Sequence, residues 1–205
     1  MSQFTRRAGL AGAGALVGAA ALAQTPPPPL PRVALTTSAG VIVVELASDK
    51  APITSRNFLR YVDAKRFDGM SFYRALKLVA TPLAGLIQGG VRNDPAKSFP
   101  PIAHESTKTT GLSHKDGALS MARYAPGTAA SEFFICVGDL ISLDADPSQP
   151  GDNEGFAAFG HVADGMDVVK KILTSPVSPT KGEDALKGQM LEPEVTILTA
   201  RRLPA

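Results

Sequence analysis

The chain has 205 residues and carries 21 Lys and Arg residues against 19 Asp and Glu residues, which gives a formal charge of +2 at pH 7. This length suits one domain with a well-formed core, and the mixed charges lack the basic stripe that nucleic-acid binding needs. A single cysteine, Cys136, excludes an intrachain disulfide, and with three histidines it matches no common zinc spacing, so we expect no metal site.

The first residues of the chain read as an export signal. Arg6 and Arg7 precede an unbroken run of apolar and small residues over 8–23, which ends in the cleavage pattern Ala-Leu-Ala. This run is shorter than a membrane span of ~20 residues. We therefore expect 1–23 to be a signal peptide that is cleaved after Ala23, so that only the precursor contacts the membrane and the mature protein is periplasmic. The paired arginines and the Ala/Gly-rich run favour a twin-arginine signal, with ordinary secretion as the alternative.

A proline-rich stretch separates the signal from the folded part. The run TPPPPLP predicts an extended spacer over 24–31, and the domain is expected to cover 32–202. In it we predict a hairpin over 33–46 and a helix over 53–69, ended by Gly69.

Short strands set off by glycine and proline follow this helix. They are predicted at SFYRAL (71–76), GLIQGG (85–90), GALSMAR (117–123), EFFICVG (132–138), FAAFGHV (156–162) and, last, PEVTILTARRL (193–203). A second amphipathic helix is predicted over 164–173, with Asp164 as its N-cap. Many short strands, two helices and no strand–helix alternation favour a mostly β fold, a closed antiparallel barrel.

Arg74 interrupts the apolar strand over 71–76. Arginine is almost never fully buried unless it has a partner. Either a structural carboxylate pairs with Arg74, or Arg74 faces a cavity in which a ligand completes its hydrogen bonds.

Six motifs, SFYR, LIQGG, GALSMAR, SEFFIC, SLD and FAAFGHVADGMDVVKKI, occur here in the order in which cyclophilin-type peptidyl-prolyl cis-trans isomerases carry them. Over about residues 32–202 the chain resembles that family, and in particular its exported bacterial members. The resemblance implies a closed eight-stranded antiparallel barrel capped by two α-helices, and an isomerase that needs no cofactor. It also implies that the partners are proline-containing segments of exported proteins, bound by a monomer.

The resemblance assigns roles to individual residues. Arg74 matches the family's catalytic arginine, and Gln88 matches the glutamine that hydrogen-bonds the substrate backbone. Met121, Phe134 and Leu143 match the socket for the proline ring, although by themselves they would be ordinary core residues.

Three substrate-binding positions carry substitutions. Arg123 replaces an asparagine whose backbone binds substrate, and Phe156 replaces a histidine on the far rim of the pocket. Glu132 replaces a glutamine, which puts a carboxylate near Arg74. There it either orients the guanidinium or competes with substrate for it.

A further departure affects the wall of the socket. The family's wall aromatic lies three residues before the glutamine, where this chain has Gly85, and the segment between Arg74 and Gln88 is longer than usual. Leu83 and Leu86 are the alternatives that could fill the space.

Two functions remain open from the sequence. The first is an isomerase that assists the folding of exported proteins, and Arg74, Gln88 and Phe134 favour it. The second is a catalytically weak module of the cell envelope that binds proline-containing segments as a chaperone. Gly85 and the longer segment favour this second function.

Overall fold

The computed structural model describes residues 1, 29–78, 83–92 and 94–204. The expected signal peptide, apart from its first residue, and the spacer up to residue 28 lie outside this part of the chain. Within the described residues, no helix combines the length and the apolar character that a membrane crossing requires.

Strands make up most of the domain. They are β1 (Arg32–Thr37), β2 (Gly40–Leu46), β3 (Met70–Lys77), β4 (Gly85–Gly90), β5 (Ala118–Met121), β6 (Phe133–Val137), β7 (Ala157–Asp164) and β8 (Met190–Arg202). The helices are α1 (Pro52–Asp63), α2 (Thr107–Thr110) and α3 (Met166–Thr174), with 3-10 turns η1 (Ile141–Leu143) and η2 (Asp184–Leu186).

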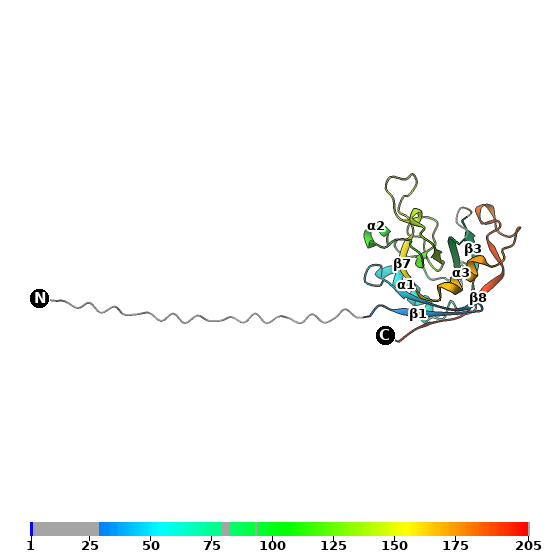
Figure 1. Ribbon diagram of the computed structural model, residues 1–205, viewed down its shortest axis with the longest axis horizontal. Coiled ribbons are helices and arrows are strands. Elements are labelled where there is room, and N and C mark those ends of the chain that lie inside the picture. Colours follow the sequence, from blue (N-terminus) through cyan, green and yellow to red (C-terminus); the bar gives the residue numbers. More distant parts are fainter. Residues whose placement is uncertain (2–28, 79–82, 93, 205) are drawn as a thin grey trace.

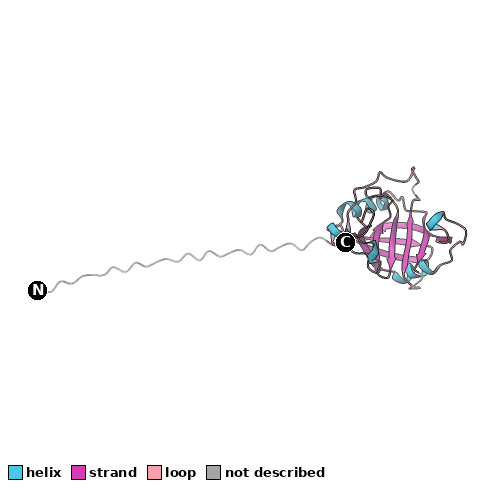
Figure 2. Ribbon diagram, turned by 90° about the horizontal axis from the view of Figure 1, so that it is seen from above, coloured by secondary structure: helices cyan, strands magenta, loops and turns pink. Residues whose placement is uncertain are grey.

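The strands close into one antiparallel barrel in the order β1-β2-β7-β5-β6-β4-β3-β8, and β8 pairs with β1. Figure 2 shows the strands crossing at the centre of the domain, with helical segments around them. The two longer helices pack against the barrel, α1 on β7 and β8, and α3 on β2, β3, β4 and β6 (Figure 1). The predicted closed eight-stranded barrel is confirmed, with the short helix α2 in addition.

Two predicted helix limits are wrong. Helix α1 ends at Asp63, because Lys65 adopts a left-handed φ of 55° and breaks the helical path before Gly69. The N-cap of α3 is Gly165, with a φ of 87°. Asp164 ends β7 instead, and its carboxylate accepts a hydrogen bond from the Gly165 N–H at 2.9 Å.

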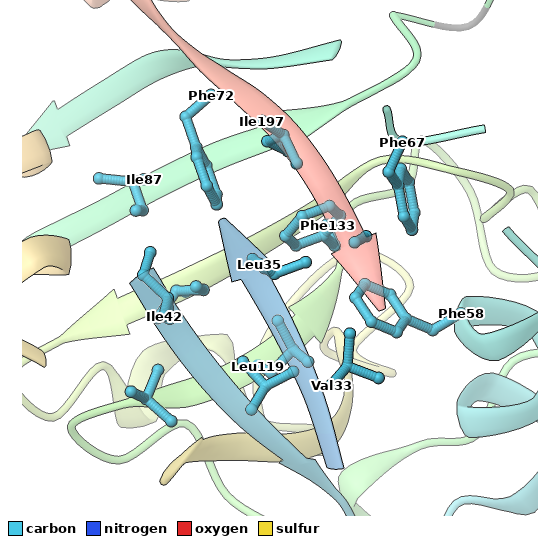
Figure 3. Close-up of a cluster of buried hydrophobic side chains, with 14 of the residues drawn as sticks. Val33, Leu35, Ile42, Phe58, Phe67, Phe72, Ile87, Leu119, Phe133 and Ile197 are labelled. Atoms are coloured by element: carbon cyan, nitrogen blue, oxygen red, sulfur yellow. The ribbon is translucent and has the colours of Figure 1, made fainter. Parts of the chain in front are cut away.

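The barrel interior is packed with aliphatic and aromatic side chains from most of the strands and from α1. In Figure 3 the labelled side chains from several strands and from α1 converge on one core. The Phe58 ring of α1 lies 5.2 Å from the rings of both Phe67 and Phe133, measured between centroids. Burying each such side chain contributes about 1.5–3 kcal/mol, so this core fixes the positions of the strands that carry the site.

A distant carboxylate caps the N-terminus of α1. Ala51 offers no side-chain cap, and Glu105 accepts hydrogen bonds from the backbone of Ile53 at 3.1 Å and of Thr54 at 2.7 Å. We expect Glu105→Ala to lower the free energy of unfolding by about 1–2 kcal/mol, measured by urea denaturation. Glu183→Ala, at an exposed position, is the control, and equal losses in the two variants would contradict the capping role.

A second, smaller apolar cluster lies apart from the main core. Its buried members are Leu86, Ala118, Phe134, Cys136 and Leu140. Side chains alternate between the two faces of a strand, so Phe134 and Cys136 point away from the interior that Phe133 and Ile135 fill. Cys136 is fully buried, and burial raises the pKa of its thiol to about 12. This outer cluster is the base on which the site is built.

Candidate active site

A cavity of about 490 Å³ lies over the outer cluster. Its walls come from β3, β4, β6, the segment after β5, η1, the residue before β7, and the segment that includes η2 and leads into β8. The lining includes Tyr73, Arg74, Leu76, Leu86, Gln88, Ala122, Arg123, Tyr124, Glu132, Phe134, Leu143, Phe156, Leu186 and Met190.

Seven of the eight predicted site residues line this one cavity. They are Arg74, Gln88, Arg123, Glu132, Phe134, Leu143 and Phe156. The barrel brings them together from positions spread over 83 residues of sequence, from 74 to 156. The arrangement combines hydrogen-bond donors and apolar surface in one open pocket.

Met121 is the exception and corrects the expectation from the family motif. Its side chain is 1% exposed and belongs to the main core, and it is not among the residues that line the cavity. Met121 lies opposite Phe133 in the β5–β6 pairing, so it shares the inward face that Phe133 occupies. It supports the strands under the cavity and does not form the wall.

Arg74 is held between the two strands that flank β3. Its backbone pairs with Gln88 on β4 and with Met190 on β8. The guanidinium donates from Nη1 to Gln88 Oε1 at 2.7 Å and from Nε to Gln189 Oε1 at 2.8 Å. Burial lowers the pKa of Arg74 below its ordinary value, although an arginine remains charged at neutral pH. Both acceptors are neutral amides, so of the two interpretations the structure favours a cavity-facing arginine.

Gln88 continues into a chain of hydrogen bonds that ends at Glu132. Its Nε2 donates to the Tyr73 hydroxyl at 2.8 Å, and that hydroxyl donates to Glu132 Oε2. Burial, and then the charge of Glu132, raise the pKa of Tyr73, so the hydroxyl keeps its proton. The Glu132 carboxylate can only accept, so the Tyr73 hydroxyl must donate to it. The Gln88 NH₂ group then donates to that hydroxyl, which leaves the Gln88 oxygen facing Arg74. Through this chain Glu132 orients the guanidinium indirectly.

Glu132 approaches the backbone closely at Gly90. A Cβ at this position would lie 2.6 Å from Glu132 Oε1, and the φ of 150° is one that only glycine adopts readily. The Glu132 side chain is thereby packed into the barrel wall, where Ser131 Oγ donates to it at 3.0 Å.

The apolar part of the cavity rests on a buried polar cluster. The Phe134 ring packs edge-on to Phe156 and stacks on His114 at 5.8 Å. His114 is fully buried, with Nδ1 at 2.5 Å from Asp144 Oδ1 and Nε2 at 2.9 Å from Ser120 Oγ. These residue types also form hydrolytic triads, but Ser120 is fully buried and unreachable by substrate. The cluster therefore acts as a rigid support for the Phe134 ring.

The Arg123 side chain fixes the acidic loop that precedes β7. It is only 5% exposed, donates to both carboxylate oxygens of Asp152 at 2.8 Å, and donates to the Gly155 carbonyl from Nε at 2.9 Å. The guanidinium also lies 5.2 Å from the centre of the Phe156 ring. The Arg123 side chain thus has a role beyond the backbone contact expected at this position, because it holds Phe156 in the cavity wall.

The missing wall aromatic is replaced in part by Leu86. Leu86 is 7% exposed and lines the cavity, whereas Leu83 is 61% exposed and does not. In the connection over residues 77–85, residues 77, 78 and 83–85 are described and none of them lines the cavity. Residues 79–82 lie outside the described part of the chain.

Sequence reasoning missed the contribution of the segment before β8. Gln189 binds Arg74, and Leu186 and Met190 line the cavity, yet the last strand was predicted to begin only at 193. No local motif marks Gln189, because its role depends on the β3–β8 pairing. Tyr73 was also missed, although it lies beside Arg74 in the motif SFYR.

Comparisons with known proteins agree in sequence and in fold. The model of a family described as cyclophilin type peptidyl-prolyl cis-trans isomerase/CLD matches residues 32–201. The chain is 37% identical over 169 residues to a peptidyl-prolyl cis-trans isomerase of Acinetobacter baylyi, over 80% of each chain. It is 34% identical over 139 residues to peptidyl-prolyl cis-trans isomerase B of Escherichia coli, over 66% of this chain and 80% of that protein. The fold is similar to the crystal structure of a Cryptosporidium parvum cyclophilin type isomerase in the presence of the dipeptide Ala-Pro, with a TM-score of 0.66 and 22% identity, over 85% of this chain and 99% of that one.

Proposed function

The chain belongs to the family of cyclophilin-type peptidyl-prolyl cis-trans isomerases, and from this premise we propose that it uses Arg74 to accelerate prolyl exchange in exported proteins. One observation carries the proposal. The Arg74 guanidinium is fixed by two amides in the same cavity as the apolar side chains of Phe134 and Leu143. A prolyl substrate needs both features, a socket for its ring and a donor for its amide.

The chemistry required is the stabilisation of a twisted amide. Rotation about a prolyl bond crosses a barrier near ~20 kcal/mol, because twisting removes the resonance of the amide. In the twisted state the prolyl nitrogen becomes pyramidal, and its lone pair accepts a hydrogen bond. A donor that binds this state more strongly than either planar state lowers the barrier.

Arg74 has donors left for such a substrate. Its Nε and one Nη1 hydrogen are engaged by Gln189 and Gln88, and within the described residues its Nη2 has no partner. The guanidinium fork therefore presents donors of fixed direction to a bound amide. The pyrrolidine ring would rest on Phe134 and Leu143 while the preceding residue turns, and no bond is broken.

Prolyl exchange in a short Ala-Pro-Phe peptide, followed by NMR exchange spectroscopy, tests the proposal. We expect the purified protein to accelerate exchange at catalytic concentrations. A folded protein that binds the peptide without accelerating its exchange would instead be the binding module considered from the sequence.

We also propose that the protein acts outside the cytoplasm. The supporting observation is the arginine pair followed by the apolar run over 8–23 and the Ala-Leu-Ala pattern. Expression of the full chain in a Gram-negative bacterium should yield a periplasmic protein whose mass corresponds to a start at Gln24. Replacing both Arg6 and Arg7 with lysine should stop export by the twin-arginine route only. An intact N-terminus in the cytoplasmic fraction would contradict export.

The chain of hydrogen bonds behind Gln88 gives a further prediction. Tyr73→Phe removes the acceptor of the Gln88 amide and a donor to Glu132, so only the bond from Arg74 Nη1 still orients the Gln88 oxygen. We expect kcat/KM for peptide exchange to fall about fivefold and the free energy of unfolding to fall by about 1–2 kcal/mol.

Tyr61→Phe is the matched control for this variant. The Tyr61 hydroxyl accepts from the Phe99 N–H at 2.7 Å, and Tyr61 is buried away from the cavity. It should lose similar stability and keep full activity. Equal activities of the two variants would show that the Tyr73 hydroxyl is only structural.

A further inference from the structure

Gln189 contacts Arg74 from a segment far away in sequence. It directly precedes β8, and its Oε1 accepts from Arg74 Nε, while Gln88 Oε1 accepts from Nη1. The two amide oxygens bind different nitrogens of the guanidinium. Gln88 approaches from the β4 side of β3, and Gln189 approaches from the β8 side. We propose that Gln189 is a positioning residue that fixes the Arg74 guanidinium for prolyl exchange, an inference that rests on the function proposed above.

The Gln189 amide is itself held in one orientation. Its Nε2 donates to the Ala185 carbonyl at 2.6 Å. Its backbone N–H donates to the Leu186 carbonyl at 3.1 Å, and its backbone carbonyl accepts from the Ala75 N–H at 2.9 Å. Rotating the amide by half a turn would place its NH₂ group against the Arg74 donor and leave the Ala185 carbonyl without that bond. The oxygen of Gln189 therefore faces Arg74.

A neutral acceptor suits this role better than a carboxylate. Arginine loses considerable side-chain entropy when it is fixed, and two amides impose that order before substrate arrives. They do so without adding a negative charge, which would attract the guanidinium strongly in a partly buried site. The charge of Arg74 thus remains available to the substrate amide.

The same segment also forms part of the cavity wall. Leu186 lies in η2, lines the cavity and is 39% exposed, and its carbonyl accepts from the backbone of Gln189. The turn that carries Leu186 therefore also sets the position of the acceptor that holds Arg74. Gln189 therefore connects the part of the cavity wall that Leu186 forms to the Arg74 guanidinium.

Two substitutions at position 189 test the inference through the rate and the affinity separately. Gln189→Leu removes the acceptor, and we expect kcat/KM for the Ala-Pro-Phe peptide to fall about tenfold, almost entirely in kcat, with KM within about twofold of wild type. Gln189→Glu keeps an oxygen at the same place but adds charge beside the guanidinium, and we expect a similar loss. Gln149→Glu makes the same chemical change at an exposed residue that does not line the cavity, and it should keep full activity.

A spectroscopic signature separates positioning from a general structural role. The Nε–H signal of Arg74, identified by its absence in Arg74→Lys, should exchange slowly with water in wild type and rapidly in Gln189→Leu. If Gln189→Leu does not fold, two measurements test the inference instead: the kcat of Gln189→Glu, and the protection of the wild-type Arg74 Nε–H signal from exchange with water. Wild-type kcat in both Gln189 variants would overturn the inference and leave the proposed function standing. A folded wild-type protein without activity would overturn the proposed function, and the Arg74 signal would still report whether Gln189 fixes the guanidinium.

Discussion

Replacing Arg74 with alanine is expected to lower kcat/KM for prolyl exchange at least about 100-fold, the usual cost of removing a donor aimed at the transition state. The free energy of unfolding should change by no more than about 1 kcal/mol. Gln88 lines the open cavity and Gln189 is half-buried beside the space that the guanidinium would leave, so water can replace the guanidinium at both amide oxygens. Activity is measured on the Ala-Pro-Phe peptide, and stability by urea denaturation.

Two further arginine variants make this result specific. Arg74→Lys keeps the charge but loses the fork, so it should recover only a small part of the activity. Arg201→Ala removes an arginine that binds Asp68 through two nitrogens, at 2.8 and 2.7 Å, and does not line the cavity. It should keep full activity. If Arg74→Ala retained more than about a tenth of wild-type kcat/KM, the arginine would not be the main source of catalysis.

The barrel could be predicted from the sequence because its signals are local. Glycine and proline separate the apolar runs, so that strand β4 was placed at its observed limits, 85–90. The errors arose where the local pattern continued past the structural element. The first helix was extended to Gly69 as the next stop signal, although Lys65 already turns the chain and Phe67 enters the core from outside the helix. Helix α2 has four residues, too few to show a helical period.

The residues that meet in the candidate cavity were predictable where one motif carried both the residue and its surroundings. Arg74, Gln88 and Phe134 belong to motifs whose strands pair directly with one another. Gln189 was missed because only the β3–β8 pairing brings it to Arg74. Met121 was misplaced because a motif fixes a position on a strand, whereas the face that the side chain takes depends on its partner, Phe133.

Restoring the family's wall aromatic with Gly85→Phe is expected to lower the free energy of unfolding by at least about 3 kcal/mol and to raise no activity. The φ of Gly85 is 149°, a conformation that residues with a side chain rarely adopt. A Cβ built there would lie 1.9 Å from the Leu76 carbonyl oxygen, which is fixed in the β3–β4 pairing. The substitution therefore destabilises the β3–β4 pairing itself, whatever space the cavity offers to the ring.

Leu83→Phe adds an aromatic ring to the same hairpin at an exposed position, and its unfolding free energy should stay within about 0.5 kcal/mol of wild type. The difference in unfolding free energy between the two variants gives the cost of the backbone conformation at position 85, separate from the effect of a larger side chain. If Gly85→Phe folded with wild-type stability and exchanged the peptide faster, the hairpin would have rearranged to accept the family's socket. The backbone conformation at Gly85 predicts the opposite, because a side chain there would meet the Leu76 carbonyl, and Leu86 lines the cavity from the next position.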